Sequence, residues 1–214
     1  PAYAEAELGT KYRLNYVREM GGKSGDFAST AALADARVLL LSVRRRALPE
    51  AQLQAVRDFV HRGGGIVAIR TSSHAFALRT GTAVPTGRRV WPEWDADILG
   101  GNYQQHHGND IPTTAEVVAG ADHPVLQGVA RERFPTGSGL YINTPLRAGA
   151  QALLVGHAQG IERPEPVAWT HQSPAGGRVF YTSLGHLADF QRPEFRRLLA
   201  NAVDWAANGS AAEK

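Results

Sequence analysis

Two short apolar segments on either side of one amphipathic helix constrain the fold of this chain most. The first segment covers residues 37–43 (Arg-Val-Leu-Leu-Leu-Ser-Val) and the second covers residues 66–69 (Ile-Val-Ala-Ile). Continuous apolar runs of this length are typical of strands buried on both faces of a parallel sheet. Apolar residues recur at helical spacing within 49–60, and the glycines at 63–65 end that helix. This order predicts a right-handed βαβ crossover.

The rest of the chain adds strands and one strong helix. Further strands are predicted at residues 114–118, 152–155, 167–170 and 178–182. A Pro-Ala-Gly-Gly turn separates the last two strands and predicts an antiparallel hairpin at the edge of the sheet. Pro193 opens a final helix with an apolar stripe. Together these elements predict one α/β domain over residues 1–207, with a mainly parallel sheet, and a flexible tail at 208–214.

The start of the chain does not fit a complete doubly wound sheet. Residues 2–8 resemble the end of a helix and residues 13–19 are compatible with a strand, but no central strand precedes them. The chain also begins with Pro1 rather than Met. We therefore expect the first strand and part of the first helix to be missing, and we leave open whether the protein is cytoplasmic or exported.

Composition excludes several classes of protein. The 214 residues include no cysteine, which excludes disulfides, thiolate metal sites and cysteine nucleophiles. The formal net charge is +3, and the most basic run, residues 44–46, is too short for a nucleic-acid groove. No apolar run is long enough to span a membrane. We therefore expect neither nucleic acid nor a membrane as a partner, and the pattern leaves a homo-oligomer possible.

Polar residues follow three of the predicted strands at the edge where open α/β sheets bind ligands. Arg44 follows the first strand, Arg70-Thr-Ser-Ser-His74 follows the second, and Ser-Leu-Gly-His186 follows the last. A guanidinium at position 70 can hold an anion or a sugar hydroxyl, although an ion pair with Asp95 or Asp110 would explain it equally well.

The polar residues near Arg70 also allow both a functional and a structural interpretation. Ser73 could bind a hydroxyl or an oxyanion, or one of the two serines at 72–73 could cap a helix. His74 could face the site or lie on a helix surface. His186, in a tight turn after the last strand, is the preferred general acid or base.

A long segment between the strands supplies a second group of candidates. His106, His107 and Asp110 lie close together in the sequence, and one imidazole could act with His74 or His186 in acid–base chemistry. It could also ligate a metal such as zinc, or simply hydrogen-bond the loop backbone. Trp94 and Tyr103 could stack on the apolar face of a sugar, or pack in the core.

Several blocks of the sequence together resemble the ThuA-like (trehalose-utilisation) family. They are Gly-Gly-Gly-Ile-Val-Ala-Ile-Arg-Thr-Ser-Ser-His at 63–74, Trp-Pro-Glu-Trp at 91–94, Leu-Gly-Gly-Asn-Tyr at 99–103, Asp-His-Pro at 122–124, Pro-Val-Ala-Trp at 166–169 and Gly-Arg-Val-Phe-Tyr-Thr-Ser-Leu-Gly-His at 177–186. The resemblance is colinear over residues 37–207 and implies a flavodoxin-like, class I glutamine amidotransferase-like three-layer sandwich. It also implies a part in the catabolism of trehalose or related sugars.

Position 70 departs from the families that the fold suggests. Amidotransferases place a nucleophilic cysteine there and ThuA-like proteins often place a histidine, whereas this chain has Arg70. The resemblance places His186 where amidotransferases keep their catalytic base. Two functions remain: an enzyme that acts on a sugar by acid–base chemistry, as an isomerase or hydrolase, and a non-catalytic carbohydrate-binding module. Amidotransfer is excluded by the absence of cysteine.

Overall fold

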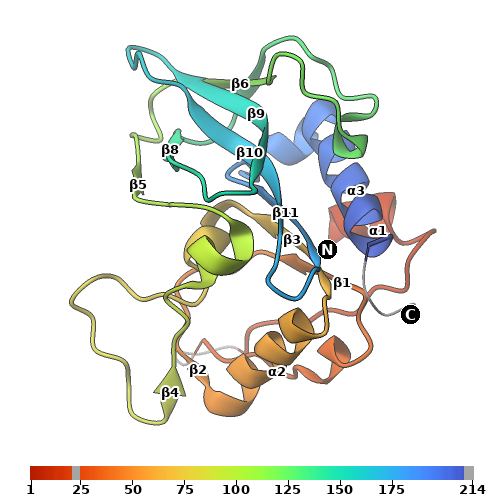
Figure 1. Ribbon diagram of the computed structural model, residues 1–214, viewed down its shortest axis with the longest axis vertical. Coiled ribbons are helices and arrows are strands. Elements are labelled where there is room, and N and C mark those ends of the chain that lie inside the picture. Colours follow the sequence, from red (N-terminus) through yellow and green to blue (C-terminus); the bar gives the residue numbers. More distant parts are fainter. Residues whose placement is uncertain (21–24, 210–214) are drawn as a thin grey trace.

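The computed structural model describes residues 1–20 and 25–209, and within them one large sheet organises the chain (Figure 1). Its strand order is β1-β3-β11-β10-β9-β6-β7. The strands are β1 (Val38–Leu41), β3 (Gly65–Ile69), β6 (Thr113–Val117), β7 (Phe134–Thr136), β9 (Gln151–Ala158), β10 (Glu165–Gln172) and β11 (Arg178–Thr182).

The βαβ unit predicted from the apolar runs is confirmed. β1 and β3 pair in parallel, with Leu41 opposite Ala68, and helix α2 (Glu50–His61) connects them. β11 joins the other side of β3, also in parallel. All five residues of β3 are buried, as a strand covered on both faces requires. Arg70 therefore follows a central strand.

Antiparallel pairing dominates the other part of the sheet. The predicted hairpin of β10 and β11 is present, but it lies in the middle of the sheet because β9 pairs with the free side of β10. β6 and β7 extend the sheet further, again antiparallel. The expected parallel pairing is thus confined to β1, β3 and β11, and the four other neighbouring pairs in this sheet are antiparallel.

Helices cover both faces of the parallel part, which confirms the three-layer α/β architecture. Helix α3 (Pro193–Ala207) packs on one face and buries its apolar stripe against residues such as Val67 and Phe180. Helix α2 and the π-helical turn η3 (Trp94–Leu99) cover the other face, against Ile66 and Tyr181. Figure 1 shows α3 and α2 on opposite sides of β3.

Short elements complete the described chain. They are α1 (Ala2–Glu7), η1 (Ala31–Leu33), β2 (Leu48–Pro49), η2 (Arg70–His74), β4 (Arg88–Arg89), β5 (Gln105–His106), η4 (Pro124–Leu126), β8 (Tyr141–Ile142) and η5 (Asp189–Gln191).

The structure contradicts one expectation for the chain ends and does not describe most of the residues of another. The strand considered for residues 13–19 is wrong, because only Glu19 forms a bridge there, with Phe27. Most of the predicted flexible tail, residues 210–214, lies outside the described residues. No described helix combines the length and apolarity needed to cross a lipid bilayer.

Candidate functional site at the carboxyl ends of β1 and β3

The backbone turns sharply after β3, at the position of Arg70. This residue has a φ of +52°, in the left-handed region that non-glycine residues rarely adopt. The hydroxyl of Tyr181 donates a hydrogen bond of 2.7 Å to the Arg70 carbonyl oxygen and helps to hold the turn. Strained backbone of this kind is concentrated at functional sites.

The Arg70 side chain lacks the partners that a structural role would require. Its Nη1 atom is buried and has no hydrogen-bond partner within the described part of the chain. Arg70 forms no ion pair with a carboxylate of the described residues, so the expected alternative of a pair with Asp95 or Asp110 is absent. The guanidinium therefore keeps donors available for a ligand.

The serines after Arg70 stabilise the turn rather than cap a helix. Ser72 Oγ donates to the Leu41 carbonyl oxygen at 2.9 Å and accepts a bond from the Val43 backbone N–H at 3.1 Å. This pair of bonds fixes the turn after β3 to the end of β1. Ser73 Oγ lies 3.0 Å from His74 Nδ1, and both side chains are buried.

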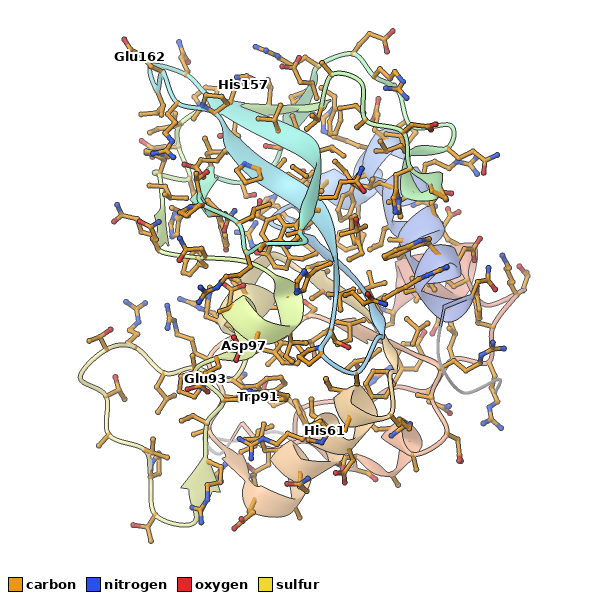
Figure 2. The ribbon with its side chains drawn as sticks, viewed as in Figure 1. His61, Trp91, Glu93, Asp97, His157 and Glu162 are labelled. Carbon is orange, nitrogen blue, oxygen red and sulfur yellow. The ribbon has the colours of Figure 1, made fainter. Side chains whose placement is uncertain are left out.

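Trp94 belongs to the core, so the expectation that it contacts a substrate is wrong. The residue is only 1% exposed, and its ring packs edge-on against Phe76 and Trp91. Its indole N–H donates a 2.8 Å hydrogen bond to the Ser72 carbonyl oxygen. Figure 2 shows the neighbouring Trp91 between η3 and α2, on the side of the sheet that α2 covers.

Four rings form a continuous row beside the turn. The His74 and Tyr103 rings have centroids 4.6 Å apart, the Tyr103 and Tyr141 rings 5.0 Å, and the Tyr141 and His106 rings 5.6 Å. Tyr141 and His74 are buried, Tyr103 is half-buried and His106 is exposed. The row thus runs from the interior to the surface and presents apolar ring faces to a ligand.

Burial perturbs two titratable groups along this row. Burial, together with the positive charges of Arg45 and Arg44, lowers the pKa of His74 to about 4, so the imidazole is neutral at pH 7. Burial raises the pKa of Asp95 to about 6. Asp95 Oδ2 accepts a 2.7 Å bond from the Tyr103 backbone N–H, whereas its Oδ1 is buried without a partner among the residues described.

Arginines surround the same rings. The Arg45 backbone N–H donates a 3.0 Å bond to the His74 carbonyl oxygen, and Arg45 has a left-handed φ of +49°. Burial raises the pKa of Tyr103, while the charges of Arg45, Arg44 and Arg79 act in the opposite direction. Burial lowers the pKa of the Arg45 guanidinium, and Arg79 and Arg44 act in the same direction. A guanidinium nevertheless stays protonated at neutral pH.

The remaining predicted site residues lie around a glycine-rich segment, residues 137–141. His107 is half-buried, and its backbone N–H donates a hydrogen bond of 2.8 Å to the Leu140 carbonyl oxygen. His106 Nδ1 lies 2.7 Å from the His107 carbonyl oxygen, which matches the loop-backbone role considered for one histidine of this pair. Asp110 is exposed and faces Gly108.

His186 lies at the other end of this segment. Its ring packs against Gly137, where an added Cβ would lie 2.7 Å from Nδ1, and the side chain is exposed. The buried Asp189 carboxylate accepts bonds from the N–H groups of Gly137, Gly185 and His186, at 2.7–2.8 Å. The segment 137–141 therefore contacts His186, His107 and the ring row, although no hydrogen bond joins His186 to Arg70 or His107 in the described structure.

A metal site finds no support in this part of the molecule. Across residues 1–20 and 25–209, no group of three or more His, Cys, Asp or Glu side chains is placed to hold a metal ion. The zinc ligand considered at His107 therefore lacks a donor set there.

Sequence reasoning missed Tyr141, Arg45 and Arg79. Arg45 follows the first predicted strand together with Arg44, but only Arg44 was selected as a candidate site residue. Tyr141 and Arg79 lie in segments without a recognisable motif, so only the folded structure brings them to the site.

Comparison with known proteins agrees with this fold. A putative ThuA-like protein from Bacteroides uniformis is 20% identical, with a TM-score of 0.61, covering 83% of this chain and 71% of that one. A putative ThuA-like protein from Parabacteroides merdae is 17% identical, with a TM-score of 0.62, covering 100% and 86%. At these identities the likeness shows the fold alone. Comparison with curated proteins gave no match. The family model described as ThuA, trehalose utilisation, matches residues 6–206, and the chain belongs to this family.

Proposed function

We propose that the protein acts on a sugar by acid–base chemistry, in the catabolism of trehalose or a related saccharide such as a 3-keto-glycoside. Membership of the trehalose-utilisation family supports the substrate class. The observation that carries the proposal is the Arg70 guanidinium, which has a buried nitrogen without a partner among the described residues, directly after the buried strand β3.

The chemistry that suits these residues is proton transfer next to a carbonyl group. One imidazole removes a proton from the carbon beside the carbonyl, and Arg70 donates hydrogen bonds to the oxyanion that develops. The first carbon carries a hydroxyl, whose proton moves to the former carbonyl oxygen while a second imidazole donates a proton to the former carbonyl carbon, so the carbonyl group changes place and the net reaction is an isomerisation without gain or loss of atoms. We assign the two imidazoles to His186 and His107.

His74 is suited to binding rather than to proton transfer. With a pKa near 4 it is neutral at pH 7 and is a weak base there. Its Nδ1 atom lies within hydrogen-bond distance of Ser73, and its ring packs against Tyr103 in a tilted arrangement. These contacts support a role for His74 as a fixed, uncharged side chain that lines the site.

Proton exchange in heavy water tests the proposal directly. The protein is incubated in D2O with trehalose, maltose and a 3-keto-glycoside, and NMR follows deuterium incorporation and new products. We expect exchange with the carbonyl sugar, and a loss of at least about 100-fold in His186→Ala, the usual contribution of a general acid or base. The control is His61→Ala, which removes an exposed histidine of α2, on another part of the molecule (Figure 2). Equal rates in His186→Ala and the parent protein would exclude the assigned role.

The second candidate function is a carbohydrate-binding module without turnover. The presence of Arg70 at the turn favours it, because a guanidinium cannot act as a nucleophile or a general base at neutral pH. Calorimetry with the same sugars separates the two functions. Saturable binding that Arg70→Gln abolishes, combined with unchanged sugar after long incubation, would assign the module.

A further inference from the structure

The arginines beside the ring row differ from those arginines of this protein that form ion pairs. Arg46, Arg88, Arg89, Arg133, Arg163 and Arg196 each pair with a carboxylate. Within the described chain no carboxylate pairs with Arg44, Arg45, Arg70 or Arg79, which we call the arginine cluster. Several positive charges without counterions therefore surround one small surface.

The fold places three members of the arginine cluster next to one another, while Arg79 lies in an exposed loop. Arg44 and Arg45 follow β1 and Arg70 follows β3, and these strands pair in parallel, so their carboxyl ends are adjacent. The Arg45 backbone is bonded to the His74 carbonyl oxygen, and Arg45 and Arg70 both have left-handed backbones. Strain of this kind persists only where the surrounding structure enforces it.

The charges of the cluster converge on the ring row. Burial has the largest effect on the pKa of His74, and the charges of Arg45, Arg44 and Arg79 lower this pKa as well. Burial raises the pKa of Tyr141, and the charge of Arg70 acts in the opposite direction. Asp95, whose charge acts on the pKa of Tyr103, accepts a hydrogen bond from the Tyr103 backbone N–H and forms no ion pair with the cluster among the described residues. The cluster is therefore not neutralised from within.

We propose that the site selects sugars that carry an anionic group, either a carboxylate or a phosphoryl ester. The arginine cluster binds the anionic group by charge-assisted hydrogen bonds, and the faces of Tyr103 and His106 contact the sugar ring. This inference rests on the proposed function and adds the substrate class to it. A neutral disaccharide would leave the guanidinium groups without counterions, whereas an anionic sugar supplies one.

Calorimetric titration at constant ionic strength tests the proposal. The probes are glucose and trehalose as neutral sugars, glucuronate and glucose 6-phosphate as anionic sugars, and inorganic phosphate alone. We expect at least one anionic sugar to bind about tenfold or more tightly than either neutral sugar, and more tightly than inorganic phosphate. The two anionic sugars distinguish a carboxylate from a phosphoryl preference. Raising the salt concentration should weaken binding of the anionic sugar only.

Two charge-matched variants locate the effect. Arg45→Gln should abolish the preference for anionic sugars. Arg133→Gln removes the same charge from an exposed pair with Glu116, beside His157 near the far end of the β9–β10 hairpin (Figure 2), and should keep the preference.

The possible outcomes separate the two proposals. Neutral sugars that bind or react as well as anionic ones would overturn the anionic class while the proposed function survives. Absence of binding and turnover with every sugar would overturn both. If Arg45→Gln still preferred anionic sugars, the arginine cluster would not be the origin of the preference. The same conclusion would follow if inorganic phosphate alone bound as tightly as the anionic sugars.

Discussion

Replacement of Asp95 by Asn should stabilise the protein at neutral pH and not at pH 4. In the native protein, burial raises the pKa of Asp95 from its ordinary value of 3.8 to about 6, although the Tyr103 N–H and the charge of Arg147 act in the opposite direction. Oδ1 is buried and unpartnered within the described residues. Ionisation of Asp95 is therefore unfavourable in the folded state, while an asparagine does not ionise.

The sign and size follow from proton linkage. Between pH 3.8 and about 6 the folded state binds more protons than the unfolded state, so the free energy of unfolding falls as the pH rises. The two pKa values differ by about 2, which corresponds to about 3 kcal/mol, fully present above pH 6. The free energy of unfolding of Asp95→Asn, minus that of the native protein, should therefore increase by up to about 3 kcal/mol between pH 4 and pH 7.

Urea unfolding followed by tryptophan fluorescence at pH 4, 5, 6, 7 and 8 measures this difference. Any constant effect of the new amide group, whose N–H would lack an acceptor, cancels because only the change with pH is used. The control is Asp97→Asn, an exposed aspartate of the same turn, which should change the free energy of unfolding by less than about 0.5 kcal/mol throughout. A difference for Asp95→Asn that stays constant from pH 4 to pH 8 would refute the reasoning.

Three further predictions concern the same region. The pKa of His74 in the folded state, about 4, lies below its ordinary value of 6.5, so the native protein should lose up to about 3 kcal/mol of stability from this group as the pH falls from 6.5 to 4. In urea unfolding, His74→Gln should lose less stability than the native protein over this pH range, and an unchanged pH profile would count against this prediction. Gly101→Ala should destabilise the protein by about 1–3 kcal/mol in thermal or urea unfolding, because the new Cβ would lie 2.4 Å from Oδ1 of Asp95, a carboxylate that the Tyr103 N–H holds through its other oxygen. Gly108→Ala meets an exposed aspartate at the same distance and should change stability far less; equal losses in the two variants would contradict this account. His186→Ala should leave the melting temperature nearly unchanged, because the ring is exposed, and a sharp fall would indicate a structural role.

The sequence was sufficient for the parallel part of the sheet and insufficient for the rest. Buried parallel strands have long apolar runs, and residues 38–41 and 65–69 display them. The position of the hairpin of β10 and β11 could not be predicted, because it depends on whether another strand pairs with β10. β9 does so, and nothing within either strand specifies this partner. The local pattern identifies a strand, while its neighbours are set by the whole chain.

The site was predictable where its residues follow strands. Arg70 and His74 were identified because strand ends converge at one edge of the sheet. The role of Trp94 was misjudged, because the bond from its indole N–H to the Ser72 carbonyl oxygen exists only after folding. Tyr141 reaches the ring row from a segment far along the chain, and such a contact leaves no local pattern.

Several unfavourable features of this protein lie in the candidate site. The left-handed backbones of Arg45 and Arg70, the Arg70 Nη1 atom that has no partner among the described residues, and the buried Asp95 carboxyl each reduce the stability of the folded state. The Arg133–Glu116–His157 group, in contrast, satisfies its charges within the protein. A ligand with an oxyanion would supply the acceptors that the arginine cluster lacks, and binding to the folded state alone would raise stability with ligand concentration. The local instability and the proposed binding specificity therefore have one physical origin, which is a set of donors and positive charges that the chain itself leaves unsatisfied.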